Sequence, residues 1–497
     1  MIPRYENPEI SAIWSNKNKL ALWQRTELAV IHARENLCRI EPLVTETIQR
    51  ILEANEIDID WWLARDKEIS HDLNAFIDER LRFLPIELQQ YFHSGMTSYD
   101  TEEPAFASML MASASMVADK IVAITETLKS MARKYRYTIM NGRTHGQEAD
   151  LQSFGKRCLT WLVAINEDRD KLLAAMENLK YSRLSGAIGN YRGVDVRIER
   201  AALSLLGFKP FYGATQIMPR ELYAPLAQSL CQTVMTLNKV ATDIRLGARS
   251  GRPIYQEPFG KKQKGSSAMP HKKNTISCEQ LEGMARLANG YTQMIVANIN
   301  TWEERAIEQS SVERVAWPDL FHVTMHSIKT MDRVLGGLAV YPDNMVAEII
   351  NSSGCYAAGE AKEFLRNYGT KYGLAAEDAY RIVQLAAFIA FEPDEESEDV
   401  RQNPPESFEE AETLLALFRE KKSTVPVSIQ DIILNGRLKP SRQLDAAAET
   451  IKQWNDLLSE MFADEDIREE WYEIFTPSYL LKGEDALYIM ILGDEIS

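Results

Sequence analysis

Cysteine is scarce in this chain of 497 residues, and it is never clustered. The five cysteines, Cys38, Cys158, Cys231, Cys278 and Cys355, lie far apart, and no two have CxxC spacing. An odd number of separated cysteines argues against a disulfide framework and against a local zinc site. The composition is typical of a reducing compartment, and we expect a cytoplasmic protein.

Long apolar runs and excess positive charge are missing as well. No uninterrupted apolar stretch reaches about 18 residues, so we expect no transmembrane helix. The opening "MIPRYENPEI" has charges and prolines where a signal peptide needs an apolar run. The formal net charge of −16 argues against a general nucleic-acid or membrane-surface binder. An anionic small substrate is still compatible, because a local cluster of lysines can outweigh the mean charge inside a cleft.

Strand-like alternation is almost absent, whereas helical periodicity dominates the chain. Apolar residues recur three to four positions apart over residues 104–135, 151–184, 220–249, 275–299 and 318–338. Helices of this length must bury their apolar stripes against one another, so we expect an all-α fold with a central bundle. The apolar residues left on its outer faces fit either a larger helical assembly or an intramolecular core.

Three regions are expected along the chain. Residues 1–103 and 356–497 have the pattern of shorter helices, and residues 104–355 hold the long ones. Segment 392–412 carries ten acidic residues, one arginine and three prolines. Such a composition cannot bury enough apolar surface to order itself. It predicts a solvated surface insertion, with a partner-binding acidic tract as the lesser alternative.

Polar interruptions of the helical pattern contain four of the seven histidines. They are "SHDLNAF" with His71, "HSGMTSYDTEE" with His93, "NGRTHGQEA" with His145 and "GSSAMPHKKN" with His271. A weaker one is "WEERAIEQSSVER", residues 302–314. None of these four histidines has a second histidine or cysteine at metal-ligand spacing, so we expect no local metal site. A metal site assembled from distant segments of the chain remains an alternative.

The run "GSSAMPHKKN", residues 265–274, lacks the pattern of a P-loop but has the features by which a P-loop binds phosphate. Small residues free the backbone N–H groups, lysines surround them, and a helix is expected to start at about Thr275. Asn274 is expected to cap that helix, whose N-terminus would favour an anion. An ordinary polar loop before a capped helix is the competing interpretation.

The same run resembles the GSSxMPxKxN signature loop of the fumarase/aspartase superfamily. The histidine after its proline resembles the branch that cleaves succinylated purine nucleotides. Further motifs of that branch occur in order: "RYENPEISAIWS", "SHD", "HSGMTSYD", "GRTHGQ", "TQIMPR" and "SSVER". The resemblance covers about residues 1–370 well and the C-terminal region loosely.

The resemblance implies β-elimination that releases fumarate from a succinylated purine nucleotide or its precursor, without a cofactor or metal. Ser266 would be the base, His145 the general acid, and His71 would bind and orient the substrate. The substrate-binding residues it implies are Arg4, Tyr5, Ser70, Asp72, Thr97, Ser98, Gln216, Ser267, Lys272, Asn274, Arg305, Ser310 and Arg314. It also implies a homotetramer whose central bundle is built by four chains and whose active sites are each shared by three subunits.

Four positions depart from the family pattern. Ser70 stands where a basic residue is usual, which puts a phosphate contact in doubt. Glu303, Ala306 and Gln309 stand where the family has two histidines and an aspartate. Two alternatives remain open: a sister lyase or cycloisomerase for another succinyl or muconate-type substrate, and a non-catalytic helical scaffold.

Overall fold

The computed structural model describes residues 1–391, 427–441 and 443–493. The acidic segment 392–412 lies outside the described residues. The described chain divides into two compact units, Met1–Thr127 with Leu162–Leu246 and Gln256–Leu338, and Leu128–Trp161 with Gly247–Tyr255 and Ala339–Ser497. Helices dominate both units, which confirms the all-α prediction. The division into three regions at 103 and 355 stays a prediction.

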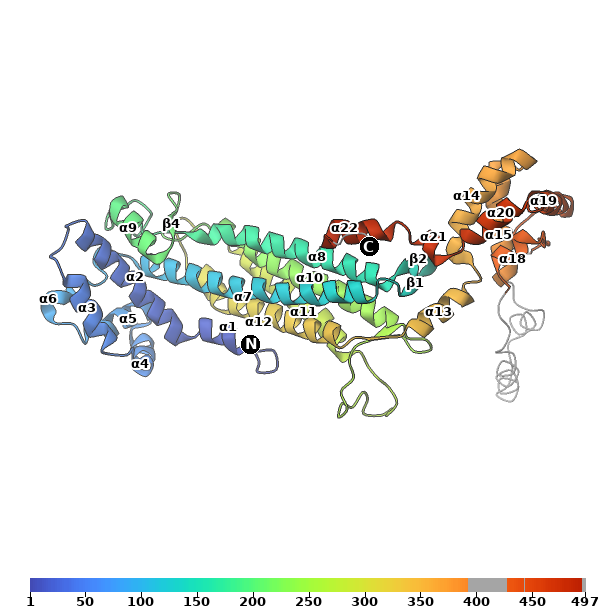
Figure 1. Ribbon diagram of the computed structural model, residues 1–497. Coiled ribbons are helices and arrows are strands. Elements are labelled where there is room, and N and C mark those ends of the chain that lie inside the picture. The colour runs from blue at the N-terminus through green and yellow to red at the C-terminus, as the bar shows by residue number, and fades with distance from the viewer. Residues whose placement is uncertain (392–426, 442, 494–497) are drawn as a thin grey trace. The chain divides into compact units, whose positions relative to one another are not determined.

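Long helices, most of whose residues belong to the first unit, form a bundle (Figure 1). They are α7 (Ser98–Lys134), α8 (Phe154–Met176), α10 (Ala224–Gly247), α11 (Ile276–Ala297) and α12 (Glu308–Gly336). Hydrogen bonds join neighbouring members: the Thr292 hydroxyl on α11 donates to the Ala227 carbonyl on α10 at 3.2 Å. Gln232 on α10 donates to Asp168 on α8 at 2.6 Å. Because such bonds satisfy polar groups between the helices, the apolar stripes can pack closely around them.

Two bundle helices start earlier than their prolines suggest. The sequence predicts helix starts at Pro104 and Pro318, but α7 begins at Ser98 and α12 at Glu308, with both prolines inside. A proline has no N–H for the carbonyl four residues earlier, which costs helix stability. Close packing offsets that cost here, since Trp317 beside Pro318 and Ala105 beside Pro104 are at most 2% exposed. Burial therefore overrides the local stop signal.

Shorter helices complete the first unit around two apolar clusters. They are α1 (Pro8–Ile13), α2 (Asn16–Asn36), α3 (Val44–Glu53), α4 (Ile59–Ile69), α5 (Asp72–Leu81), α6 (Ile86–Gln89) and α9 (Val196–Leu206). Short 3₁₀ turns and strands join them: η1 (Glu177–Lys180), β3 (Tyr181–Ser182), β4 (Lys209–Pro210) and η2 (Arg220–Leu222). β3 pairs with β4 in parallel. The larger cluster gathers Trp23, Trp62, Phe76 and Phe92 from α2, α4, α5 and the segment before α7, so this core fixes the loops that carry "SHD" and "HSGMTSYD".

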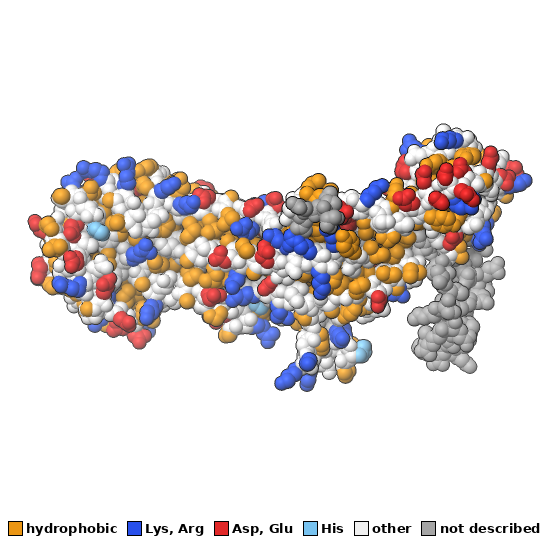
Figure 2. All heavy atoms as spheres, in the orientation of Figure 1, with side chains coloured by type: hydrophobic (Ala, Val, Ile, Leu, Met, Phe, Trp, Pro, Cys, Tyr) orange, Lys and Arg blue, Asp and Glu red, His pale blue; other side chains and the backbone are white. Residues whose placement is uncertain are grey.

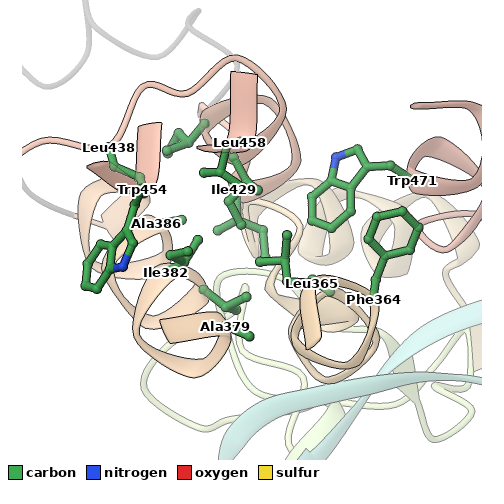
Figure 3. Close-up of a cluster of buried hydrophobic side chains, with 14 of the residues drawn as sticks. Phe364, Leu365, Ala379, Ile382, Ala386, Ile429, Leu438, Trp454, Leu458 and Trp471 are labelled. Atoms are coloured by element: carbon green, nitrogen blue, oxygen red, sulfur yellow. The ribbon is translucent and has the colours of Figure 1, made fainter. Parts of the chain in front are cut away.

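The second unit has its own core in its C-terminal helices (Figure 3). Its elements include α13 (Pro342–Asn351), η3 (Cys355–Ala357), α14 (Ala358–Gly369), η4 (Thr370–Tyr372), α15 (Ala376–Phe391), α18 (Ile429–Leu434), α19 (Ala448–Met461), α20 (Glu465–Glu473), α21 (Pro477–Leu480) and α22 (Glu484–Leu492). Ile382 on α15, Leu458 on α19 and Trp471 on α20 are fully buried. Helices α15, α18, α19 and α20 bury residues three or four positions apart, as an amphipathic pattern requires.

A β-hairpin in the second unit replaces part of an expected helix. β1 (Ile139–Thr144) pairs antiparallel with β2 (Gln147–Ser153), whereas the sequence predicts a helix from residue 151. β5 (Tyr255–Gln256) and β6 (Ala339–Val340) form another two-stranded sheet. The register of β1 and β2 shifts between Asn141 and Arg143. The low sheet content that we expect holds for the described residues.

α7 is the one described helix long and apolar enough, by length and composition, to span a membrane. Half of its most apolar window is buried in the protein. The core helix of a bundle passes the same test, and the hydroxyl of Thr127 near its end bonds Asp332 of α12 at 3.3 Å. We therefore describe α7 as a bundle helix.

Candidate active site

The signature loop precedes α11 and holds Ser266 in a hydrogen-bonded turn. The Ser266 Oγ accepts the backbone N–H groups of Ala268 at 3.3 Å and Met269 at 3.1 Å. Donors that point at a hydroxyl oxygen stabilise negative charge on it. The loop thus provides two of the hydrogen-bond donors that a serine needs to act as a base.

The two ends of this loop meet at Gly265. The Asn274 side chain donates to the Gly265 carbonyl at 2.7 Å. A Cβ atom on Gly265 would lie 1.8 Å from the Lys272 carbonyl oxygen, so only glycine fits this close approach. The tie keeps Ser266 near the first turn of α11, while Ser267, His271 and Lys272 are exposed.

The expected helix cap at Asn274 is wrong. Thr275 occupies the N-cap position of α11, and its side chain makes no capping bond. The carboxylate of Glu257 accepts the N–H groups of Ser277 at 3.1 Å and Cys278 at 3.0 Å instead. Glu257 is 4% exposed, so a carboxylate from the chain already occupies the helix N-terminus. This helix end is therefore not an open anion site, while Lys272 and Lys273 of the loop are exposed.

His71 caps a helix of the first unit. The chain leaves α4 at Ser70, which has a left-handed backbone (φ 51°), and enters α5 at Asp72. The His71 Nδ1 accepts the Asn74 N–H at 3.2 Å. An accepting Nδ1 assigns the proton to Nε2, so neutral His71 presents an N–H donor at its other ring nitrogen. Ser70 itself is exposed and uncharged.

Asp72 and Arg314 bring "SHD" and "SSVER" together. The Arg314 guanidinium donates to the Asp72 carboxylate at 2.8 Å. Both residues line a cavity of about 240 Å³ in the first unit. Its other lining residues are Trp14, Asn16, Lys19, Trp23, Tyr99, Glu102, Ala105, Phe106, Met109, Arg220, Ser310 and Glu313. The cavity joins aromatic walls to several charged groups, a combination typical of small-molecule pockets.

Arg305 and Gln216 also meet. The Arg305 guanidinium donates to the Gln216 Oε1 at 3.0 Å, and it lies 4.2 Å from the centre of the Tyr99 ring. The Tyr99 hydroxyl accepts from the Gln309 amide at 2.8 Å. Gln309, one of the departures from the family pattern, thus belongs to a connected group that orients Arg305.

Thr97 and Ser98 stand where α7 begins. The Thr97 N–H donates to the Asp100 carboxylate at 2.8 Å, and Asp100 also pairs with Arg183 at 3.0 Å. Asp100 and Arg183 are fully buried. This backbone arrangement caps the helix and leaves Thr97 and Ser98 half-buried. Their position is compatible with both a cap and a substrate contact.

His145 occupies the turn of the β1–β2 hairpin in the second unit. Its φ of 53° and the φ of 78° at Gly146 place two successive residues in the left-handed region. Such a pair makes the type I′ turn that suits the twist of a hairpin. The His145 side chain is exposed, and neighbouring Arg143 pairs with Glu148 at 3.3 Å and Glu348 at 3.1 Å. The imidazole of His145 is therefore exposed to solvent at the tip of a short hairpin that strand pairing and the ion pairs of Arg143 stabilise.

Arg4 and Tyr5 lie along the middle of α12. The Tyr5 ring packs edge-on against His326 at 5.0 Å, and the Asn7 N–H donates to the Nδ1 of His322 at 3.0 Å. His322 is 5% exposed and accepts this bond, so its role is structural. Arg4 is exposed.

His93 has a structural role that its motif does not reveal. Its Nδ1 lies 2.7 Å from the buried Glu27 carboxylate, which also accepts from the Thr101 hydroxyl. Burial lowers the pKa of His93, but the hydrogen bond and charge of Glu27 outweigh burial and raise it above its ordinary value. The histidine thereby ties "HSGMTSYD" to α2.

Ser266 and His71 lie toward opposite ends of α12. Arg314 bonds Asp72, while Arg333 of the same helix donates to Ser277 at the start of α11 at 2.8 Å. The two arginines are nineteen positions apart, roughly 28 Å along a helix that rises 1.5 Å per residue. Within this unit, the chain does not bring the two groups together.

Sequence reasoning missed a buried charge network behind the site. The Arg220 guanidinium, from "TQIMPR", bonds Glu313 of "SSVER" at 2.9 Å and also Glu103 of α7. All three residues are at most 5% exposed. Buried ion pairs of this kind fix the relative positions of the segments that carry them. In the described ranges, no group of three or more His, Cys, Asp or Glu side chains could hold a metal ion.

Solved structures share the fold over nearly the whole chain. A fumarate lyase from Mesorhizobium sp. matches with a TM-score of 0.70 at 18% identity, covering 96% of this chain and 99% of that one. A β-carboxy-cis,cis-muconate cycloisomerase from Acinetobacter calcoaceticus matches with a TM-score of 0.74 at 18% identity, covering 98% of both chains. At this identity the likeness concerns the fold alone.

Relatives found by sequence identify the family more specifically than the solved structures do. A family model described as lyase matches residues 8–290. The adenylosuccinate lyase of Synechocystis sp. is 34% identical over 79% of this chain and 89% of its own length. That of Aquifex aeolicus is 33% identical over 82% of this chain and 92% of its own length, and that of Bacillus subtilis 31% identical over 79% and 89%. The chain is a lyase that acts on a small molecule, and it belongs to the adenylosuccinate lyase family.

Proposed function

We propose that this chain is a carbon–nitrogen lyase of purine nucleotide biosynthesis. It eliminates fumarate from adenylosuccinate to give AMP, and from SAICAR to give AICAR. The observation that carries this proposal is the identity of 34% to an adenylosuccinate lyase over 89% of that protein. The muconate-type alternative is not favoured, because the cycloisomerase shares only 18% identity.

Proton abstraction is the first step that the residues must explain. Ser266 takes the proton next to a carboxylate of the substrate, and a hydroxyl does so only as an alkoxide. The N–H groups of Ala268 and Met269 stabilise that charge, and exposed Lys272 adds a positive charge when the loop closes over the substrate.

Departure of the nitrogen is the second step. His145 protonates the leaving nitrogen, because imidazole exchanges protons near neutral pH. His71 holds the substrate through its Nε2–H, since its Nδ1 is engaged by Asn74. Asp72 and Arg314 hold the turn that carries it.

The anionic groups of the substrate need cationic and hydrogen-bonding partners. Arg305 and Arg314 suit carboxylate or phosphate oxygens through their planar pairs of donors. The remaining partners that we propose are Arg4, Tyr5, Ser70, Thr97, Ser98, Gln216, Ser267, Lys272, Asn274 and Ser310. No cofactor or metal takes part in this scheme.

We also propose a cytoplasmic homotetramer in which three subunits build each active site. Hydrophobic side chains are exposed along the bundle helices (Figure 2). The large exposed ones include Val122, Val163, Met235, Leu287 and Met294. Contiguous apolar surface of this kind is typical of subunit contacts. Separation of Ser266 from His71 along α12 also favours sites shared between chains.

Release of fumarate tests the function directly. Purified protein should convert adenylosuccinate to AMP and fumarate, and SAICAR to AICAR and fumarate, which absorbance and chromatography can follow. If folded protein releases fumarate from neither substrate, the proposed function is wrong, and a screen of other succinyl and muconate-type substrates replaces it.

Mixing two inactive variants tests the sharing of sites. Ser266→Ala and His71→Ala should each be nearly inactive, whereas a mixture that is unfolded and refolded together should regain activity. Some sites of a mixed tetramer then combine an intact Ser266 with an intact His71 from different chains, reaching at most about a quarter of wild-type activity for random assembly. Separately refolded and then combined variants are the control. No recovery in the mixed oligomer would contradict shared sites.

A further inference from the structure

Lys19 lies in the candidate site although no motif contains it. It belongs to α2 and lines the cavity, and its side chain is half-buried. The ammonium group lies 5.0 Å from the centre of the Trp23 ring and 4.8 Å from that of Trp62. Contacts with two rings hold the charge in one place.

Trp62 connects this ammonium to the turn that carries His71. The indole N–H of Trp62 donates to the Asp72 carbonyl at 2.9 Å. Lys19 and the Asp72 side chain also line the same cavity. The positive charge of Lys19 therefore stands beside the Ser70–Asp72 turn, where Ser70 contributes none.

No carboxylate among the described residues forms an ion pair with Lys19, although acidic groups line the cavity. The Asp72 carboxylate is paired with Arg314 at 2.8 Å. Burial, and then the charge of Asp72, raise the pKa of Glu102 to about 7, so this group is only partly ionised at neutral pH. Burial also lowers the pKa of Lys19, against the opposing charge of Asp72. A half-buried cation without a fixed counter-ion favours binding of an oxyanion from outside.

We propose that Lys19 is a further substrate-binding residue, whose ammonium receives a phosphate or carboxylate oxygen of the succinylated nucleotide at the Ser70–Asp72 turn. The proposal rests on the proposed function and deepens it. Arg314, which lines the same cavity, fixes the position of the Ser70–Asp72 turn through its bond to Asp72. Lys19 supplies the positive charge that Ser70 does not.

Kinetics of charge-changing variants test the proposal. Lys19→Gln should raise the KM for adenylosuccinate about tenfold with little change in kcat, as expected for one charge-assisted contact. Lys19→Arg should restore KM to within about threefold of wild type because it keeps the charge. Lys17→Gln, an exposed lysine of the same helix, is the matched control and should leave KM unchanged.

Acetylation of the wild-type protein gives a second measurement that does not depend on the folding of a variant. AMP, fumarate or both are added at saturation before brief treatment with acetic anhydride, and modification of Lys19 and Lys17 is followed by mass spectrometry. Protection of Lys19 by AMP alone assigns the phosphate, and protection only with fumarate present assigns a carboxylate. Lys17 should react equally throughout.

The outcomes separate this inference from the function on which it rests. If the wild-type protein releases no fumarate, the proposed function fails and the inference fails with it. If the wild-type protein is active but Lys19 is not protected by either product, or Lys19→Gln has the KM of wild type, the inference alone is overturned.

Discussion

Replacement of Ser266 by alanine should lower kcat by about 10³- to 10⁴-fold, the upper part of the range expected when a positioned proton acceptor is lost. The alanine cannot accept the proton, whereas the loop N–H groups and the lysines remain. Because the Ser266 side chain, among the residues that the structure describes, bonds only N–H groups of its own loop, the melting temperature should stay that of the wild type. Steady-state kinetics with adenylosuccinate and thermal unfolding measure the two quantities.

Lys261→Ala is the matched control for this experiment. Lys261 is an exposed residue of the same loop region without a proposed role, so its loss should change kcat by less than about twofold. Product binding provides a further check, because Ser266→Ala should still bind AMP. Full activity of Ser266→Ala would overturn the assignment of the base while leaving the family membership untouched.

Replacement of His145 by asparagine should lower kcat by about 10²- to 10³-fold, since a general acid contributes rate of this order. Asparagine tolerates the left-handed backbone that the turn requires at this position, so the hairpin should persist. The loss should fall on kcat rather than on KM, because protonation of the leaving nitrogen occurs in the transition state.

The pH profile distinguishes loss of an acid from loss of structure. The wild-type rate should decline at alkaline pH, because a general acid must be protonated to act. In His145→Asn this decline should disappear from the residual activity. Gln147→Ala, a change at the other side of the turn, should keep the wild-type profile. A variant of His145 with wild-type kcat would make His71 the better candidate for the acid.

Much of the fold follows from local patterns in the sequence. The three-to-four-residue spacing of apolar side chains predicts the bundle helices, and α11 agrees with its expected range of 275–299 to within a few residues. These predictions succeed because burial of one helix face depends on neighbours along the same helix. The predicted starts of α7 and α12 are wrong, because packing around Pro104 and Pro318 outweighs the local cost of a proline in a helix.

The hairpin at His145 shows where local patterns fail. The segment "NGRTHGQEADLQS" alternates too weakly to predict strands, and its pairing depends on a two-residue turn with left-handed residues. Capping of α11 by Glu257 was missed for a related reason. Its carboxylate reaches N–H groups twenty and twenty-one positions away along the chain, a contact that no short motif encodes.

The sequence by itself identifies the chemical groups of the candidate site. Motifs directly show a serine between glycine and small residues, a histidine in a polar turn and arginines near helix ends. Which of these groups lie close together depends on tertiary structure. Arg314 of α12 bonds Asp72 at the start of α5, whereas Arg333 near the other end of α12 bonds Ser277, so Ser266 and His71 are held apart. Lys19 lies beside the turn at Asp72 because its ammonium contacts Trp62, forty-three positions further along the chain, whose indole N–H bonds the Asp72 carbonyl. Contacts between distant segments depend on the packing of whole helices, which no single stretch of sequence specifies.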